Sequence, residues 1–215
     1  MYLVNAPFWL KKIYPKLHWN FSREEKCIYL TFDDGPTPEI TNWTLNVLKQ
    51  YNAKATFFCI GNNIEKHPNI FKNIINEGHA IGNHTHNHIK GWKTKTKEYL
   101  DNISEAQKVI DYHIENPKPK TQNLFRPPHG QIKPKQGKKL MELGYKIIMW
   151  NVLSLDWDAE ISSEACLNNV ISKTTKGSII VFHDSIKASK NMQYALPRVL
   201  EYFSKKGYNF KRLEV

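Results

Sequence analysis

The strongest constraint on the fold of this chain is a repeated alternation of short apolar segments with longer amphipathic ones. The apolar segments are four to seven residues long and rich in β-branched and aromatic residues, which is typical of buried strands. The amphipathic segments repeat apolar residues every three or four positions, and several end at a glycine, which is typical of helices. We predict strands at residues 26–32, 54–60, 79–83, 123–126, 146–150, 178–182 and 208–213, helices at 41–51, 69–77, 95–114, 134–143, 162–173 and 192–204, and a proline-containing linker at 116–120.

This alternation predicts a parallel sheet covered by helices, because a crossover between parallel strands usually contains a helix. About seven strand–helix units in a chain of 215 residues suit either a barrel or an open, doubly wound sheet. Clusters of polar side chains follow the carboxyl ends of the predicted strands. Both architectures place their active sites at that end of the sheet, so we expect the clusters to form one site.

The first two clusters contain residues that suit a divalent metal ion. Asp33 and Asp34 follow the first predicted strand within an Asp-Asp-Gly-Pro sequence, which is also typical of a turn. After a buried strand, however, adjacent carboxylates repel and need a cation or hydrogen bonds. The spacing of His84 and His88 predicts two imidazoles that face one ion from a helical turn, whereas His86 between them is a poorer ligand. With Asp34, the two histidines would leave coordination positions open for water and substrate, as a hydrolase requires.

Three further clusters supply groups for acid–base chemistry. Arg126 lies in an Arg-Pro-Pro-His-Gly sequence, which is either a rigid turn with a surface arginine or an arginine that pairs with Asp33. In the second interpretation the stiff turn would aim a backbone N–H at a developing oxyanion. His183 directly follows the strand predicted at 178–182 and is either a buried structural histidine or a general acid. Asp156 would orient His183 and raise its pKa.

The composition limits the class of partner and the redox state. A formal net charge of +11 suggests an anionic partner, but the lysines are scattered apart from groups at 90–97 and 133–139, and no nucleic-acid-binding signature accompanies them. We therefore expect a solvated basic surface and no nucleic-acid partner. Cys27, Cys59 and Cys166 are odd in number and lack metal-binding spacing, so we expect free buried thiols, with a Cys27–Cys59 disulfide as the minor alternative.

The N-terminal segment contains no apolar run long enough for a secretory signal or a spanning helix. Pro7 precedes Phe8-Trp9-Leu10, and Lys11-Lys12 follows. We therefore expect a cytoplasmic monomer without stable membrane insertion, or a secreted or envelope protein if an export segment is missing. Residues 1–23 are basic and aromatic, and we expect them to cover the bottom of the barrel or to contact a membrane surface.

The ordered set of clusters resembles the five motifs of the polysaccharide deacetylases, which are the NodB-homology enzymes of carbohydrate esterase family four. The motifs are Thr31 to Pro36, His84-Thr85-x-x-His88, Arg126 to Gly130, Leu155-Asp156-Trp157 and Val181-Phe182-His183. The resemblance extends over residues 26–213. It implies an α/β fold, a distorted (β/α)7-type barrel that forms a single NodB-homology catalytic domain at 24–215, preceded by an N-terminal extension at 1–23.

The resemblance also implies a role for each site residue. One divalent metal ion, zinc foremost with cobalt or nickel as alternatives, would be held by Asp34, His84 and His88. Catalysis would depend on Asp33 as base, His183 as acid, and Arg126 and Asp156 as the groups that orient them. Substrate binding would involve Pro127, His129, Trp157 and Val181, the last two as walls of a pocket for the acetate methyl group. The implied reaction is hydrolysis of N-acetyl groups, with O-acetyl groups as an alternative, on a chitin-like or peptidoglycan-type glycan.

Three departures from the family pattern bear on the substrate more than on the reaction. His129 stands where the family commonly has tyrosine, Leu153 replaces the first acid of the fourth motif, and Val181 replaces leucine. One alternative is an amidohydrolase of the same fold that acts on a small non-sugar amide. A second alternative is a non-catalytic protein that binds carbohydrate or nucleic acid, which the presence of the complete set of catalytic and ligand residues disfavours.

Overall fold

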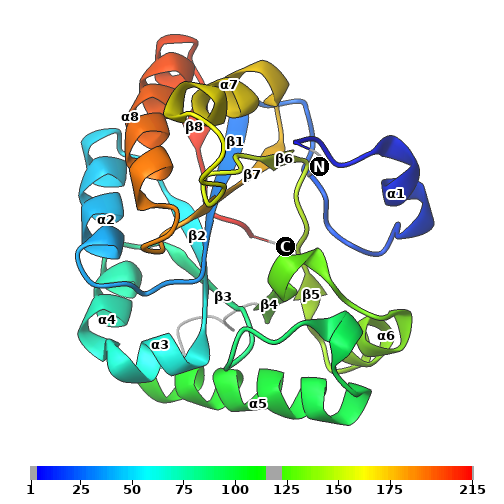
Figure 1. Ribbon diagram of the computed structural model, residues 1–215. Coiled ribbons are helices and arrows are strands. Elements are labelled where there is room, and N and C mark those ends of the chain that lie inside the picture. Colours follow the sequence, from blue (N-terminus) through cyan, green and yellow to red (C-terminus); the bar gives the residue numbers. More distant parts are fainter. Residues whose placement is uncertain (1–3, 115–122, 215) are drawn as a thin grey trace.

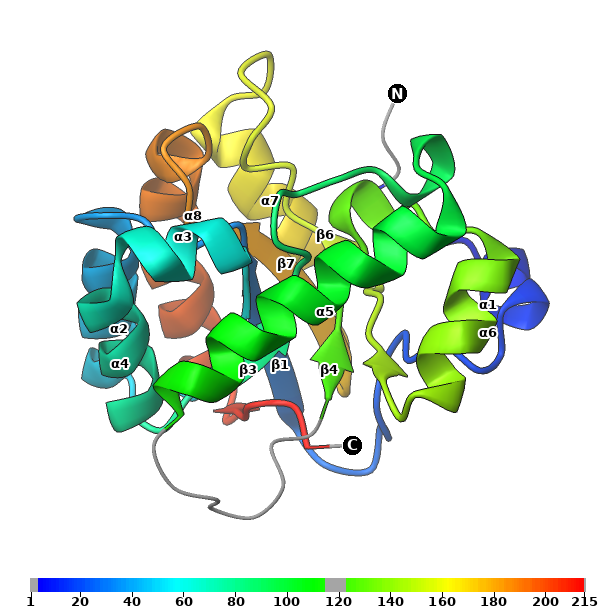
Figure 2. The ribbon, with the colours of Figure 1, turned by 90° about the horizontal axis from the view of Figure 1, so that it is seen from below.

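The structure is a computed structural model that describes residues 4–114 and 123–214 (Figure 1). The strands in these residues are β1 (Cys27–Asp33), β2 (Ala55–Cys59), β3 (Ala80–Asn83), β4 (Leu124–Phe125), β5 (Lys146–Ile147), β6 (Val152–Leu153), β7 (Ser178–His183) and β8 (Asn209–Phe210). They form one parallel sheet in the order β5-β4-β3-β2-β1-β7-β6, and β8 pairs with the start of β1. The sheet curls into an incomplete barrel, which confirms the predicted distorted α/β barrel (Figure 2).

Helices cover the outside of the curled sheet. They are α1 (Phe8–Ile13), α2 (Ile40–Gln50), α3 (Gly61–Lys66), α4 (Pro68–Asn76), α5 (Thr96–His113), α6 (Pro134–Glu142), α7 (Ser163–Lys173) and α8 (Ser189–Lys205), with 3-10 turns at Gly91–Lys93 and Pro128–Gly130. All six predicted helices and all seven predicted strands are present. We did not predict α1, α3 and β6, because elements of six and two residues are too short to show a periodic pattern. The linker predicted at 116–120 lies outside the described residues.

Successive residues of the central strands face two different layers, as strand geometry requires. Leu30 and Phe32 of β1 pack in the main core between the sheet and the helices. Between them, Thr31 faces the interior of the barrel, where its hydroxyl accepts a hydrogen bond from the buried Arg126. The alternation brings Asp33, the last residue of β1, to the same interior side, where Arg126 also contacts it. Polar groups therefore gather inside the barrel at the carboxyl ends of its strands.

The N-terminal segment lies where the barrel would otherwise remain open. The strands β5 and β6 follow each other in the chain but do not pair. The amide of Leu153 donates to the carbonyl of Val4 at 2.8 Å, and the amide of His18 donates to the carbonyl of Ile147 at 3.0 Å. The described part of residues 1–23 thus packs into the same fold, and a domain boundary at residue 24 stays a prediction. Within the described ranges, no helix combines the length and apolarity needed to cross a membrane.

The three cysteines are free and buried, as predicted. The alternative of a Cys27–Cys59 disulfide is wrong, because the two residues lie at opposite ends of the sheet. Cys27 begins β1, Cys59 ends β2, and the register pairs Leu30 with Ala55. This register offsets Cys27 and Cys59 by seven residues along the strands, which correspond to about 23 Å, far beyond the reach of a disulfide.

Candidate active site

The register of two neighbouring strands places the two candidate acid–base residues beside each other. Asp33 of β1 pairs with His183 of β7, and both are the last residues of their strands. The side chain of Asp33 is buried and that of His183 is largely buried. Because both strands are parallel and end at the same edge, their terminal side chains open toward the same space at the carboxyl end of the barrel.

Asp33 forms a buried ion pair with Arg126, whose Nη1 lies 2.7 Å from its Oδ1. The guanidinium is completely buried and its other N–H groups are also used. They donate to Thr31 Oγ1 at 2.6 Å and to the carbonyls of Ile148 at 3.3 Å and Met149 at 3.0 Å. These contacts fix the position of the Arg126 guanidinium group, which in turn orients the Asp33 carboxylate. The interpretation of Arg126 as a surface residue of a turn is wrong.

Asp34, His84 and His88 converge on one point. The Oδ1 atom of Asp34 lies 3.6 Å from Nε2 of His84 and 3.2 Å from Nε2 of His88, and the three ligand atoms lie within 4.8 Å of one another. This Oδ1 atom is buried, and within the described residues the imidazole nitrogens of His84 and His88 are the polar groups that approach it, without hydrogen-bond geometry. Nδ1 of His84 lies 2.8 Å from the carbonyl oxygen of Arg126, which fixes the proton on Nδ1 and leaves the Nε2 lone pair directed at Asp34.

The charge states of this cluster also suit a cation. Burial lowers the pKa of His84 to about 4, so its imidazole is neutral at physiological pH. Burial alone would raise the pKa of Asp34, but the imidazoles of His88 and His183 outweigh it and hold that pKa well below its usual range. An anionic oxygen and two imidazole nitrogens form a donor set that fits zinc, cobalt or nickel, with coordination positions left over.

The loop that carries the two histidines differs from our prediction. His84 and His88 do not lie on a helical turn, because the residues after β3 form an irregular loop. Thr85 and His88 adopt left-handed φ angles of 66° and 53°, and Asn83 Oδ1 accepts a hydrogen bond from the amide of Thr85 at 2.9 Å. These bends bring both imidazoles to Asp34. The side chain of the intervening His86 points elsewhere, and its Nε2 lies 3.6 Å from Oε1 of Glu105.

His183 is held by Asp156 on two sides. Nδ1 of His183 lies 2.8 Å from Oδ1 of Asp156, and the backbone amide of His183 donates to Oδ2 at 2.7 Å. Burial alone would lower the pKa of His183, but the buried Asp156 carboxylate outweighs it and raises the pKa to about 9. The imidazolium can therefore persist at neutral pH, with Nε2 as the remaining N–H donor.

The structure brings the predicted substrate-binding residues to the same region. The ring of His129 lies 4.7 Å from that of His88, and the ring of Trp157 lies 4.6 Å from that of His183. Val181 lies two residues before His183 in β7, in an apolar cluster against which Trp157 packs. Pro127 is buried directly after Arg126. His129 is exposed at the rim and has a left-handed φ of 57°. Partial desolvation of its ring, together with the nearby His88 and Lys90, lowers its pKa, which favours a neutral imidazole.

Asp184, to which we assigned no role from the sequence, holds the loop that carries Asp33 and Asp34. Its buried carboxylate accepts hydrogen bonds from the amide of Gly35 at 3.1 Å and from the hydroxyl of Thr41 at 2.5 Å. A Cβ atom on Gly35 would lie 2.0 Å from Oδ2 of Asp184, so only glycine allows this approach. The only local signal was the position of Asp184 next to His183, since its partners lie more than 140 residues away.

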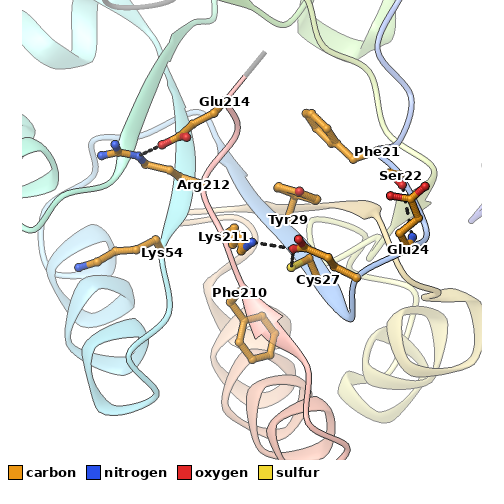
Figure 3. A pocket seen from close by; sticks show the side chains of 11 residues that line it. Phe21, Ser22, Glu24, Cys27, Tyr29, Lys54, Phe210, Lys211, Arg212 and Glu214 are labelled. Atoms are coloured by element: carbon orange, nitrogen blue, oxygen red, sulfur yellow. Dashed lines mark hydrogen bonds and ion pairs between the residues drawn. The ribbon is translucent and has the colours of Figure 1, made fainter. Parts of the chain in front are cut away.

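A cavity of about 520 Å³ lies at the opposite end of the barrel (Figure 3). Its lining includes Cys27, the first residue of β1, and Lys54, which directly precedes β2. Figure 3 shows that charged groups around it pair with each other, such as Arg212 with Glu214, whose Nε and Oε1 lie 3.0 Å apart. Nζ of Lys211 likewise lies 2.8 Å from Oε2 of Glu25. The cavity is therefore remote from Asp33 and His183, and these paired charges are satisfied without a ligand.

Comparisons with known proteins agree with this geometry. The family model described as polysaccharide deacetylase matches residues 21–148. A peptidoglycan-N-acetylglucosamine deacetylase of Bacillus cereus is 34% identical over 194 residues, which cover 89% of this chain and 88% of that protein. A peptidoglycan-N-acetylmuramic acid deacetylase of Bacillus subtilis is 31% identical over 194 residues, covering 89% and 71%. The crystal structure of a peptidoglycan N-acetylglucosamine deacetylase superposes with a TM-score of 0.87 at 33% identity, covering 97% of this chain and 95% of that one.

Proposed function

Because this chain belongs to the polysaccharide deacetylase family, we propose that it removes the N-acetyl group from N-acetylglucosamine residues of peptidoglycan-type glycans in a metal-dependent reaction. Membership makes the chain a hydrolase of carbon–nitrogen bonds other than peptide bonds. The observation that carries the proposal is the convergence of Asp34, His84 and His88 beside the paired Asp33 and His183. A binding protein would not need this combination of ligands, base and acid.

The residues that would hold the metal ion are Asp34, His84 and His88. A divalent ion bound there would act as a Lewis acid toward the acetamide carbonyl and lower the pKa of water, and zinc is the first choice, with cobalt and nickel as alternatives. The orphaned Oδ1 of Asp34 and the fixed tautomer of His84 are the features of this chain that support the assignment.

Asp33 is the proposed general base. Arg126 fixes one carboxylate oxygen at 2.7 Å, so the carboxylate is oriented before substrate arrives. Asp33 removes a proton from the water that attacks the acetamide carbon, and a new carbon–oxygen bond forms. The stiff turn after Arg126 supports stabilisation of the oxyanion by a backbone N–H group.

His183 is the proposed general acid. Its pKa of about 9 keeps it protonated at neutral pH, and the Asp156 contact at Nδ1 leaves Nε2 to deliver the proton. The carbon–nitrogen bond breaks as the amine nitrogen receives this proton, and the products are acetate and a free amino sugar. Trp157 and Val181 are suited to form the apolar wall against the acetyl methyl group, because both pack in the cluster next to His183.

The test is to treat purified peptidoglycan with metal-stripped protein, with and without added zinc, and to analyse the muropeptides by mass spectrometry. We expect zinc-dependent loss of single acetyl groups from N-acetylglucosamine units. Loss of acetyl groups from N-acetylmuramic acid units would mean that the substrate sugar differs from the one proposed, whereas the reaction is the same. No loss from any glycan, by protein shown to contain zinc, would contradict the proposal and favour a small non-sugar amide.

A further inference from the structure

The helix α1 presents an apolar and basic surface to solvent. Phe8, Trp9 and Ile13 are 72%, 60% and 59% exposed, and no residue of α1 is buried. Phe8 and Lys12, and likewise Trp9 and Ile13, are four residues apart, so they project from one side of the helix. Tyr14 and Lys16 are exposed directly after it. We refer to these six residues, Phe8, Trp9, Lys12, Ile13, Tyr14 and Lys16, as the α1 surface.

The helix α1 is held in place by contacts on both sides of it in the chain and on its inner face. The chain is bonded to the sheet before α1, through Val4 and Leu153, and after it, through His18 and Ile147. On the inner side of α1, Leu10 packs against a buried cluster that includes Trp19. The indole nitrogen of Trp19 also donates to the carbonyl of Tyr14 at 3.1 Å. Figures 1 and 2 place α1 at the periphery of the molecule, where its outer side meets no other helix of the described residues.

The charged residues of the N-terminal segment that contains α1 are all positive. Residues 1–23 contain Lys11, Lys12, Lys16 and Arg23 and neither aspartate nor glutamate. The ammonium group of Lys12 lies 4.7 Å from the centre of the Phe8 ring, so the positive and aromatic groups share one face. Both figures place α6 on the same side of the molecule as α1. The helix α6 carries three exposed lysines, Lys135, Lys138 and Lys139.

We propose that the α1 surface docks this protein on an anionic lipid bilayer. Large apolar side chains next to lysines are the combination that binds the boundary between charged headgroups and acyl chains. A second copy of the chain fits poorly, because two basic surfaces would repel each other. A soluble polyanion would pair with the lysines but would offer no apolar phase to Phe8 and Ile13. The inference is independent of the proposed function.

The test is co-sedimentation of the full-length protein with vesicles. We expect binding to vesicles of phosphatidylcholine with one-third phosphatidylglycerol, weaker binding as salt is added, and little binding to pure phosphatidylcholine. Equal partitioning to both vesicle types, or to neither, would overturn the proposal.

Matched variants separate apolar insertion from charge attraction. The double variant Trp9→Ser/Ile13→Ser should weaken binding to anionic vesicles by about ten-fold or more, because each side chain loses its apolar burial. Tyr112→Ser, which removes an aromatic ring that is 81% exposed on α5, should leave binding unchanged. An unchanged melting temperature would show that the double variant is folded. Full binding by the folded double variant would mean that charge alone acts, and it would overturn the proposal.

The lysines are tested in the same assay. Lys12→Gln/Lys16→Gln should reduce binding to anionic vesicles several-fold, by the loss of two attractive charges at the headgroups. The control Lys108→Gln/Lys190→Gln removes two exposed lysines from α5 and α8 and keeps the same net charge as the first variant. An equal reduction in both would show that only the total charge matters, which would contradict docking through the α1 surface.

Discussion

Asp33 and His183 occupy directly paired positions on the adjacent parallel strands β1 and β7. One residue after Asp33, Asp34 adopts a left-handed φ of 81°, and its carboxylate meets His84 and His88 instead of Arg126. Two consecutive aspartates thereby enter different environments, one an ion pair and the other a cluster of imidazoles. This division is what the proposed roles require, with Asp33 as the base and Asp34 as a metal ligand.

The role of Asp33 as base predicts the effect of Asp33→Asn. The amide keeps an oxygen for Arg126 but cannot accept the proton of the attacking water, so turnover should fall about 10²- to 10⁴-fold. Zinc content should stay that of the wild-type protein, because Asp33 is not a proposed ligand. Steady-state acetate release together with elemental analysis checks both expectations, and undiminished turnover would remove Asp33 from the mechanism.

The proposed ligand set predicts a difference between two histidines of one loop. His84→Ala should lose most of the bound zinc, because it removes one of three protein ligands. His86→Ala is the matched control and should keep its zinc, since Nε2 of His86 lies near Glu65 and Glu105 and not near Asp34. Elemental analysis after dialysis measures the zinc content of both variants. Full zinc content in His84→Ala would exclude His84 as a ligand.

The Asp156–His183 pair predicts the alkaline limit of activity. The acid must be protonated, so activity should persist up to about pH 9 and fall above it, where His183 loses its proton. Asp156→Asn removes the charge that raises this pKa and leaves the burial that lowers it, so the alkaline limb should move to lower pH. The pH profile of kcat/KM measures the shift, and a limb that stays in place would contradict the assignment.

The same pair makes a prediction about stability. Because the pKa of His183 is raised from 6.5 to about 9 in the folded protein, the pair stabilises the fold fully below pH 6.5. This contribution should disappear as the pH rises toward 9. Chemical denaturation of the wild type and Asp156→Asn across that range should therefore show a difference in unfolding free energy that shrinks at high pH, and a constant or growing difference would contradict the pairing.

The hydrogen bond between Thr41 and Asp184 predicts that a hydroxyl group outside the proposed ligand set supports metal binding. Thr41→Val removes a donor to buried Asp184 and an acceptor for the amide of Thr37, at 2.5 and 2.8 Å. We expect an unfolding free energy lower by about 1–3 kcal/mol and zinc affinity reduced about ten-fold or more. Denaturation and a competitive zinc titration measure the two quantities.

Thr44→Val is the matched control on the same helix. Thr44 is equally buried, but its hydroxyl contacts the carbonyl of Ile40 within α2 at 2.9 Å and Sδ of Met192 in α8 at 3.9 Å, and neither partner belongs to the loop that carries Asp33 and Asp34. Its zinc affinity should equal that of the wild type. Equal losses of zinc affinity in both variants would mean that α2 packing, and not the contact with Asp184, supports the site.

Much of the fold was predictable because its strands and helices carry strong local patterns. The apolar run at β1 is buried apart from the half-buried Tyr29. Of the stripe predicted on α5, Tyr99, Ile103, Ala106 and Ile110 are buried, and Ile114 is half-buried. Local sequence patterns did not distinguish a barrel from an open sheet. The difference depends on where Val4 and His18 meet the sheet, and no periodic pattern encodes such bridges. The predicted localisation and monomeric state stay predictions.

The site residues were predictable by type and position, but not all of their geometry. Carboxylates and imidazoles at strand ends indicate a site wherever the sheet brings those ends together. The left-handed φ of Thr85, by contrast, is not indicated by its residue type, because β-branched residues rarely adopt it, and the helical turn was a wrong prediction. Asp184 was missed because its carboxylate acts on Gly35 through a contact that exists only in the folded chain.

The central claim is that Asp34, His84 and His88 hold a metal ion that deacetylation requires. The most direct measurement is acetate release from N-acetylglucosamine oligomers by one preparation of protein, first metal-free by elemental analysis and then with one equivalent of zinc. We predict no release above background without metal, and turnover restored by zinc in the wild type but not in His84→Ala. Equal turnover by metal-free and zinc-loaded protein would contradict the account.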